Sequence, residues 1–190
     1  WNMTTRSTPK PDRMIFDLDP GEGVAWPAVR EAAQLMKSFL DELGLKSLLK
    51  TSGGKGLHVV VPLAPKHTWQ AVRQFSQAIV VHMAQVVPQR FVAKSGPRNR
   101  VGKIFIDYLR NGWGATPASA WSARARPGLG VSVPIDWSEL AQVDGGAQWN
   151  VRNIAPRLAV GNAPWGAFAS SRQSLAAAMK ALGVATEDVS

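Results

Sequence analysis

Hydrophobic residues follow two different periods along the chain. Short apolar runs at 13–18, 46–51 and Leu57–Leu63 predict β-strands, and the last of these is also rich in β-branched residues. Residues 25–43 instead repeat their apolar positions with the period of an amphipathic helix, and residues 68–87 predict a second helix. The first half of the chain therefore alternates between strands and helices.

The ends of the two predicted helices are marked by residues with known positional preferences. Pro27 suits the first turn of the first helix, and Gly44 suits its end. For the second helix, His67 or Thr68 is the expected N-cap, and Pro88 sets the limit at the other end.

Shorter elements are predicted in the second half. We expect strands at 90–94, 102–109 and 131–134, a short helix that begins at Asp136, and a last helix from Ser170 to Leu182. Residues 110–130 are rich in Gly, Pro, Ala and Arg, which favours an extended, functional loop.

The order of these elements predicts an α+β fold with a mostly antiparallel sheet backed by helices. The runs at 46–51 and Leu57–Leu63 flank a short glycine-containing turn, which is typical of an antiparallel hairpin. We find no internal repeat and no linker long enough to separate domains.

Composition narrows the possible functions. The net charge is +9, from 22 Lys and Arg against 13 Asp and Glu, which favours a polyanionic partner such as nucleic acid or a nucleoside triphosphate. The absence of cysteine excludes disulfides, thiolate zinc sites and cysteine nucleophiles, and it fits a reducing cytoplasm. No apolar stretch approaches the roughly 18–20 residues of a membrane span, so no membrane association is expected.

Asp17 and Asp19 are the first candidates for chemistry. They lie two residues apart at the end of a predicted strand, so both carboxylates should project from the same face. Two such carboxylates repel each other unless a cation or a proton lies between them. Oxygen ligands of this kind suit magnesium or manganese, although the pair could equally be a solvated strand end before the turn at Pro20.

Asp107 is a third candidate because it interrupts an apolar strand. A buried carboxylate needs a cation, an arginine or several hydrogen bonds. One interpretation is a structural salt bridge with Arg110 or Arg100. The other is that Asp107 joins Asp17 and Asp19 as the third ligand of a two-metal centre.

The segment Lys50–His58 is a candidate phosphate-binding turn. Its three glycines let the backbone approach closely and turn its N–H groups toward an anion. Ser52 offers a hydroxyl, and Lys50, Lys55 and His58 add charge or donors. The glycine spacing does not match a P-loop, and a plain hairpin turn is the simpler alternative. Several arginines bracket Asp107 and could grip phosphate in pairs of hydrogen bonds, or they could be solvated surface residues: Arg98, Arg100, Arg110, Arg124 and Arg126.

The three motifs, in this order, resemble the archaeo-eukaryotic primase superfamily, and most closely the polymerase domain of bacterial DNA ligase D. The residues that carry the resemblance are Asp17-Leu-Asp-Pro-Gly21, Thr51–His58, Asp107–Asn111 and Ala118–Gly128. The resemblance implies a primase-polymerase fold with a palm sheet like that of an RNA-recognition motif. It also implies transfer of nucleotides to a primer 3′-hydroxyl.

The resemblance further implies roles for single residues. Asp17, Asp19 and Asp107 would hold two metal ions, with Mn2+ preferred over Mg2+. The incoming NTP or dNTP would be bound by Ser52, Gly53, Gly54, Lys55, Gly56, His58, Arg100, Arg124 and Arg126.

The biological setting is likewise implied by the resemblance. The family extends DNA ends and fills short gaps in non-homologous end joining, favours ribonucleotides, and works with the Ku protein. Its ligase and nuclease domains belong to the same larger enzyme, and the expected location is the bacterial cytoplasm, at the nucleoid.

The chain also departs from the family pattern. Family members carry a sizeable module before the Asp-x-Asp motif, whereas Asp17 lies close to the first residue here, and a histidine expected near this point is absent. The chain has no starting methionine. We therefore expect residues 1–190 to be the palm region, the C-terminal two-thirds of a larger polymerase domain.

Two other functions stay open at this stage. Phe16-Asp-Leu-Asp19 also matches the opening motif of haloacid-dehalogenase-type phosphotransferases, but Gly21 stands where that family has Thr or Val. Alternatively, the chain could be a basic module that binds nucleic acid without catalysis, in which case binding would survive loss of the three acids.

Overall fold

A six-stranded sheet forms the centre of the computed structural model, which describes residues 1–3 and 10–185. The strands are β1 (Arg13–Pro20), β2 (Leu48–Thr51), β3 (Leu57–Pro62), β4 (Phe91–Val92), β5 (Ile104–Asp107) and β6 (Pro134–Ile135). Their order is β4-β5-β1-β3-β2-β6, and every neighbouring pair is antiparallel except β4 and β5. The predicted mostly antiparallel sheet is confirmed.

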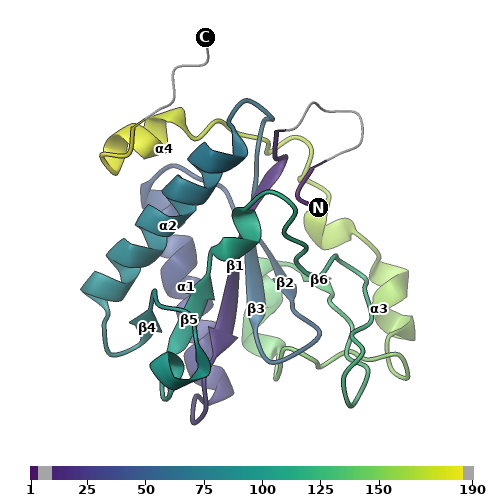
Figure 1. Ribbon diagram of the computed structural model, residues 1–190. Helices are drawn as coiled ribbons and strands as arrows, with labels where there is room; N and C mark the ends of the chain where they lie inside the picture. Colours follow the sequence, from purple (N-terminus) through teal and green to yellow (C-terminus); the bar gives the residue numbers. More distant parts are fainter. Residues whose placement is uncertain (4–9, 186–190) are drawn as a thin grey trace.

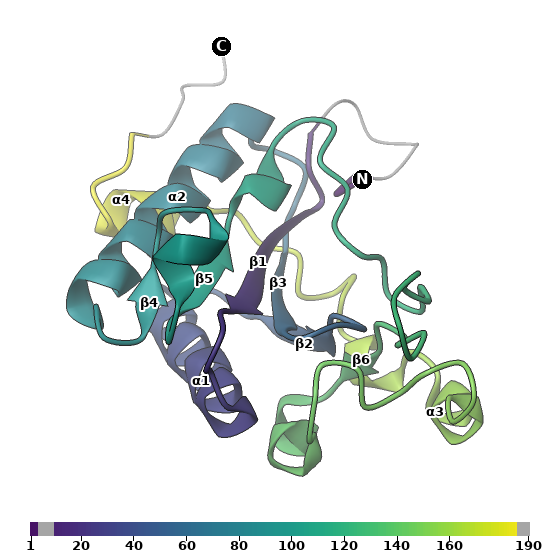
Figure 2. The same cartoon turned by 60° about the horizontal axis from the view of Figure 1, so that its bottom comes forward.

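Helices cover one face of this sheet. The α-helices are α1 (Trp26–Glu42), α2 (Trp69–Val86), α3 (Ala155–Val160) and α4 (Ala176–Ala181). Short 3-10 helices lie at Pro97–Arg100, Leu109–Asn111, Trp137–Gln142 and Ala163–Trp165. Figures 1 and 2 show α1, α2 and α4 together on one side of the sheet, while the long segment after β5 passes toward the β6 edge.

The alternation of side chains along β1 separates the two faces. Met14, Phe16 and Leu18 are fully buried and join the hydrophobic core with residues of α1 and α2. Asp17 and Asp19 occupy the alternate positions and therefore face away from the helices. Because Met14, Phe16 and Leu18 are buried in the core, the acidic positions between and after them lie on the opposite face of the sheet.

The predicted helix ends agree with the structure. Pro27 lies in the first turn of α1, and Gly44 follows its end with φ of +71°, a value that favours glycine. At the start of α2 the Thr68 hydroxyl accepts a hydrogen bond from the Ala71 N–H at 3.1 Å. Thr68 is therefore the N-cap, and His67 is not.

In the second half, two predicted elements were misplaced and one helix was missed. The strand expected at 131–134 lies at Pro134–Ile135, and α3 was not predicted. The last helix starts at Ala176 instead of Ser170, because Gln173 is held in an extended bridge with Leu63 and its carbonyl accepts from the Ala64 N–H. The helix expected at Asp136 forms, as a 3-10 helix closed by a capping box with Glu139.

Among the residues that the structure describes, no helix is both long enough and apolar enough to cross a membrane.

Candidate active site

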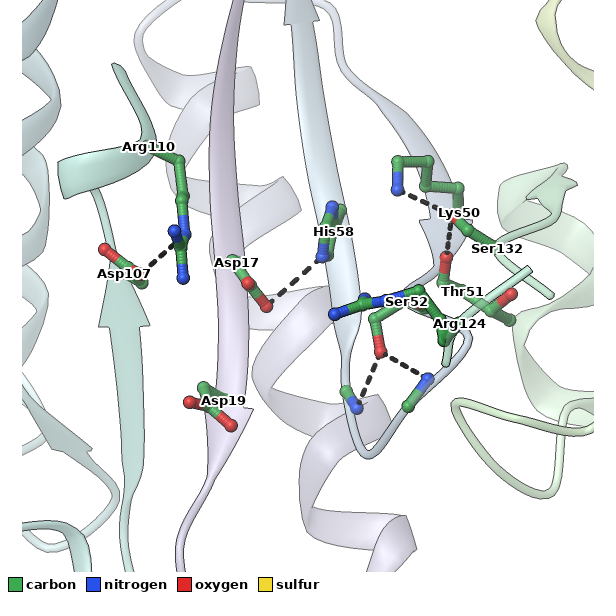
Figure 3. A network of polar contacts seen from close by, with 12 residues as sticks. Asp17, Asp19, Lys50, Thr51, Ser52, His58, Asp107, Arg110, Arg124 and Ser132 are labelled. Carbon is green, nitrogen blue, oxygen red and sulfur yellow. Dashed lines mark hydrogen bonds and ion pairs between the residues drawn. The ribbon is translucent and has the colours of Figure 1, made fainter. Parts of the chain in front are cut away.

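A row of ionisable side chains crosses the open face of the sheet. Strand register places Asp107 beside Asp17, Asp17 beside His58, and His58 beside Lys50, on four neighbouring strands. Paired residues on neighbouring strands project from the same face, so the four side chains form one line. Figure 3 shows this line, with Asp19 two residues further along β1 than Asp17. The sheet therefore brings together all three predicted acids.

Asn111 holds β1 where β5 has ended. Its amide oxygen accepts from the Ile15 N–H, and its amide N–H donates to the Ile15 carbonyl, both at 2.8 Å. Asn111 is almost completely buried. The side chain thus replaces the strand pairing that stops at Asp107 and fixes the backbone two residues before Asp17.

Arginines pair with two of the acids. The Arg110 guanidinium lies 3.1 Å from Asp107, which also accepts a hydrogen bond from the Leu109 N–H at 2.9 Å. Arg100 forms an ion pair with Asp19. The salt-bridge interpretation considered for Asp107 therefore describes Arg110 correctly, but Arg100 pairs with a different acid.

The pKa shifts show that the acids influence one another. Burial raises the pKa of Asp107, and the negative charges of Asp17 and Asp19 raise it further, while Arg110 acts in the opposite direction. Burial would also raise the pKa of Asp17, but the combined attraction of His58, Lys50 and Arg110 holds it below its ordinary value. The three carboxylates favour cations near them, and the neighbouring basic side chains supply part of this positive charge.

His58 lies next to Asp17 with its hydrogen-bonding capacity unused. Its Nε2 is 3.3 Å from an Asp17 carboxylate oxygen, yet neither ring nitrogen makes a well-formed hydrogen bond in the described part of the chain. Burial lowers the pKa of His58 and so favours the neutral ring, although the charge of Asp17 acts against this. A buried polar group without a partner is unusual in a protein and is often explained by a ligand.

Lys50 is the least expected member of the row. Its side chain is only 2% exposed, and its ammonium group donates to the Ser132 hydroxyl at 2.7 Å. Burial lowers its pKa to about 7, even though Asp17 attracts the charged form. The Ser132 hydroxyl in turn donates to the Thr51 carbonyl at 2.7 Å, so Lys50 is tied to the backbone just before the glycine turn.

The residues present fit divalent metal ions in their donor chemistry. The three carboxylates supply the hard oxygen ligands that magnesium and manganese prefer. Within residues 1–3 and 10–185, however, no three His, Cys, Asp or Glu side chains already surround a common point. Arg100 and Arg110 engage Asp19 and Asp107, and these arginines would have to release the two carboxylates to a metal.

The glycine turn at Ser52–Gly56 is closed by its own serine. The Ser52 hydroxyl oxygen accepts from the Gly54 and Gly56 N–H groups, both at 3.1 Å. These N–H groups are therefore already satisfied, contrary to the expectation that they would point at an anion. The hydroxyl keeps its own proton to donate, and the Lys55 side chain is exposed.

The predicted phosphate-binding arginines surround this turn. Arg124 donates to the Ser52 carbonyl at 2.9 Å, and Figure 3 shows its side chain beside Ser52. Lys55, Arg100 and Arg126 line a hollow of about 420 Å³ whose wall also includes Asp19. Three cations and a candidate metal ligand thus share one hollow beside the acidic row, which suits a polyphosphate. Arg98 is exposed and does not line this hollow.

The sequence did not predict the roles of two residues of the site, Lys50 and Asn111. Lys50 was grouped with the glycine turn, but its burial beside His58 follows from the hairpin register. Asn111 was noted only as the last residue of a family motif and was given no role, because an asparagine in a loop is usually exposed. Only its position opposite the free edge of β1 gives it a role.

Comparison with known proteins identifies a family that matches most of the chain. Residues 1–165 match the model of the LigD primase-polymerase domain. The multifunctional non-homologous end joining protein LigD of Pseudomonas aeruginosa is 50% identical over 182 residues, which is 95% of this chain and 22% of that protein. The corresponding protein of Mycolicibacterium smegmatis is 33% identical over 68% of this chain and 17% of its own length. The chain therefore spans about a fifth of the length of these relatives.

A solved structure has the same fold. The polymerase domain from Mycobacterium tuberculosis Ligase D, in complex with DNA, aligns with a TM-score of 0.73 and 28% identity. The alignment covers 80% of this chain and 53% of that one. Because the family model covers most of the chain and the fold agrees, the chain belongs to the LigD primase-polymerase domain family, a family of nucleotidyltransferases.

Proposed function

We propose that this chain is the palm region of a polymerase that adds nucleotides, preferentially ribonucleotides, to DNA 3′ ends during non-homologous end joining. One observation carries the proposal: Asp17, Asp19 and Asp107 lie on one face of two paired strands, beside a hollow lined by cations. Membership of the LigD primase-polymerase family supports the same function.

Asp17, Asp19 and Asp107 would hold two divalent ions, with manganese preferred to magnesium. Such ions, when bound, neutralise charge on the reacting phosphate and lower the pKa of an attacking hydroxyl. The role of the three side chains is to act as ligands, so none of them needs to accept or release a proton. The lowered pKa of Asp17 keeps its carboxylate ionised, as a metal ligand must be.

The basic residues would hold the triphosphate. Lys55, Arg100 and Arg126 can reach its oxygens from the hollow that they line, and Arg124 can contribute its remaining N–H groups. The Ser52 hydroxyl proton and the unpartnered nitrogens of His58 are further donors or acceptors for the nucleotide. In the reaction, the primer 3′-hydroxyl would give its proton to water as its oxygen forms a bond to the α-phosphorus, and the bond from that phosphorus to the oxygen that bridges to the β-phosphate would break and release pyrophosphate.

The larger setting of the chain is part of the proposal. We place residues 1–190 in a larger polymerase domain, because the match covers only 53% of the M. tuberculosis polymerase chain. The partners would then be DNA ends, nucleoside triphosphates, the Ku protein, and the ligase and nuclease domains of the same enzyme. Repair of double-strand breaks would take place in the cytoplasm, at the bacterial nucleoid.

Incorporation of labelled ribonucleotide on a primer–template tests the proposal. With manganese present, the wild-type chain should extend the primer, and Asp17→Ala should lower the rate by roughly a hundredfold or more, because a metal ligand is lost. Circular dichroism should show that the variant keeps its fold, since Asp17 lies on the open face and not in the core.

The same assay distinguishes the alternatives. Extension at a normal rate by Asp17→Ala or Asp107→Ala would overturn the proposed role of the acids. Equal use of ribo- and deoxyribonucleotides would leave the polymerase proposal intact but refute the ribonucleotide preference. Phosphatase activity without nucleotide, as the haloacid-dehalogenase alternative requires, is not expected from a member of this family.

A further inference from the structure

A distant loop supports the glycine turn from behind. The loop Asp144–Gln148 lies almost ninety residues after the turn Ser52–Gly56, yet their backbones are in contact. A Cβ atom added at Gly146 would lie 2.5 Å from the Gly56 carbonyl oxygen and 2.8 Å from the Gly54 carbonyl oxygen. Gly146 is buried, so only a residue without a side chain allows this approach.

Gly130 adds a second backbone contact to the same turn. A Cβ atom at Gly130 would lie 2.6 Å from the Gly53 carbonyl oxygen and 2.8 Å from the Ala147 side chain. The Gly130 carbonyl also accepts a hydrogen bond from the Arg124 N–H at 2.8 Å. The turn, the 144–148 loop and the Arg124 segment are thus packed together without intervening side chains.

Hydrogen bonds hold the 144–148 loop in its conformation. The Gln148 side-chain oxygen accepts from the Asp144 N–H at 2.6 Å, which closes the loop. The Trp26 indole of α1 donates to the Val143 carbonyl just before it. The loop and the turn together border a cavity of about 720 Å³, whose lining also includes Glu22, Trp26 and Lys55. A loop held by hydrogen bonds against the backbone of the turn can set the position of the turn.

We propose that Gly146 is a positioning residue for nucleotide binding. By lacking a side chain it lets the 144–148 loop hold the Ser52–Gly56 turn, and with it Ser52 and Lys55, at the correct distance from the acidic row. The inference rests on the proposed function of that turn. It assigns a role in the site to a segment that has no catalytic residue of its own.

Neighbouring glycines provide a matched test. Gly146→Ala must push the loop and the turn apart, whereas Gly145→Ala should be harmless, because a Cβ atom there meets nothing within 4 Å. We expect Gly146→Ala to raise the nucleotide KM by roughly tenfold or more, with kcat changed by less than about threefold, because the metal ligands stay in place. The dissociation constant of the manganese–nucleotide complex, measured by calorimetry, should rise by a similar factor.

A second variant protects the test against misfolding. Gln148→Ala removes the hydrogen bond that closes the loop but introduces no clash, and we expect about a threefold to fivefold rise in the nucleotide dissociation constant. If Gly146→Ala fails to fold, the nucleotide affinity of Gln148→Ala tests the positioning role of the loop. Wild-type binding in Gln148→Ala and in any folded Gly146→Ala would overturn the inference.

The failure of this inference can be told from failure of the proposed function. If wild-type protein neither binds nucleotide nor extends a primer, both are refuted together. If Asp17→Ala is inactive but Gly146→Ala matches Gly145→Ala and the wild type, the polymerase proposal stands and only the positioning role is lost.

Discussion

The environment and the pKa of Lys50 change strongly when the protein folds. In the sequence it is one of several basic residues near a glycine turn, and in the structure its ammonium group is buried between charged neighbours. Asp17 attracts its charge, whereas Arg124 and Arg13 repel it. The net effect of burial and these charges is a pKa of about 7, so the charged form costs stability.

Lys50→Met is therefore expected to stabilise the protein at pH 6 by about 1–3 kcal/mol. Between pH 7 and pH 10.5 the unfolded chain keeps a proton that folded Lys50 has released, so the stability of the wild type rises with pH and the advantage of the variant shrinks. Urea unfolding at a series of pH values measures this. A pH-independent difference, or the same gain from exposed Lys46→Met, would contradict it.

The acidic residues were predictable at the residue scale for a simple reason. Two positions separated by two residues on a strand share a face in any sheet, so Asp17 and Asp19 could be paired from their spacing alone. The identity of their partners could not be inferred in this way. Arg100 and Arg110 flank the Asp107 strand almost symmetrically in sequence, and only the folded loops assign Arg100 to Asp19 and Arg110 to Asp107.

At the scale of elements, β1 depends on a side chain from outside the sheet. Its Ile15 backbone would be unpaired on one side if Asn111 did not supply both a donor and an acceptor. Because Asn111 is buried, water cannot replace these two bonds easily. The acidic end of β1 is thereby held in register with Asp107.

We expect Asn111→Ala to lower the free energy of unfolding by about 2 kcal/mol or more, since a buried N–H and a buried carbonyl lose their partners. Chemical denaturation followed by tryptophan fluorescence measures the change. Asn99→Ala, at an exposed position with one hydrogen bond to the backbone, is the control and should have a much smaller effect. Equal stability of the two variants would show that Asn111 does not hold the strand.

The long helices and the central strands were predicted well, and the late elements poorly. α1, α2, β1 and β3 bury enough residues for their hydrophobic period to be visible in the sequence. The last helix was placed too early because Ser170–Ser174 have no pattern that reveals the bridge between Gln173 and Leu63. A contact with a distant strand decided that boundary, and local propensity did not.

At the scale of the whole molecule, the net positive charge comes from the protein as a whole and does not depend on the candidate site. The net charge is +9, and the acids of the site account for three of the thirteen acidic residues. Polyanions should therefore be attracted to the protein even when the site is altered, and the attraction should depend on counterion release.

DNA binding is accordingly expected to weaken by roughly tenfold or more when monovalent salt rises from about 50 to 200 mM. The same binding should survive in an Asp17→Ala, Asp107→Ala double variant, which should still be unable to extend a primer. Fluorescence anisotropy with a labelled duplex measures the affinity. Binding that is insensitive to salt, or that is lost with the two acids, would contradict this expectation.

By itself the sequence determined the α+β class, the two main helices, the shared face of Asp17 and Asp19, and the motifs typical of the family. All of these depend on spacings of a few residues, which local geometry turns into structure. The tertiary structure decided that Asp107 lies beside Asp17, that Lys50 is buried, and that Gly146 contacts the glycine turn. These features join segments far apart in the chain, and strand order and register, which local spacing does not specify, bring such segments together.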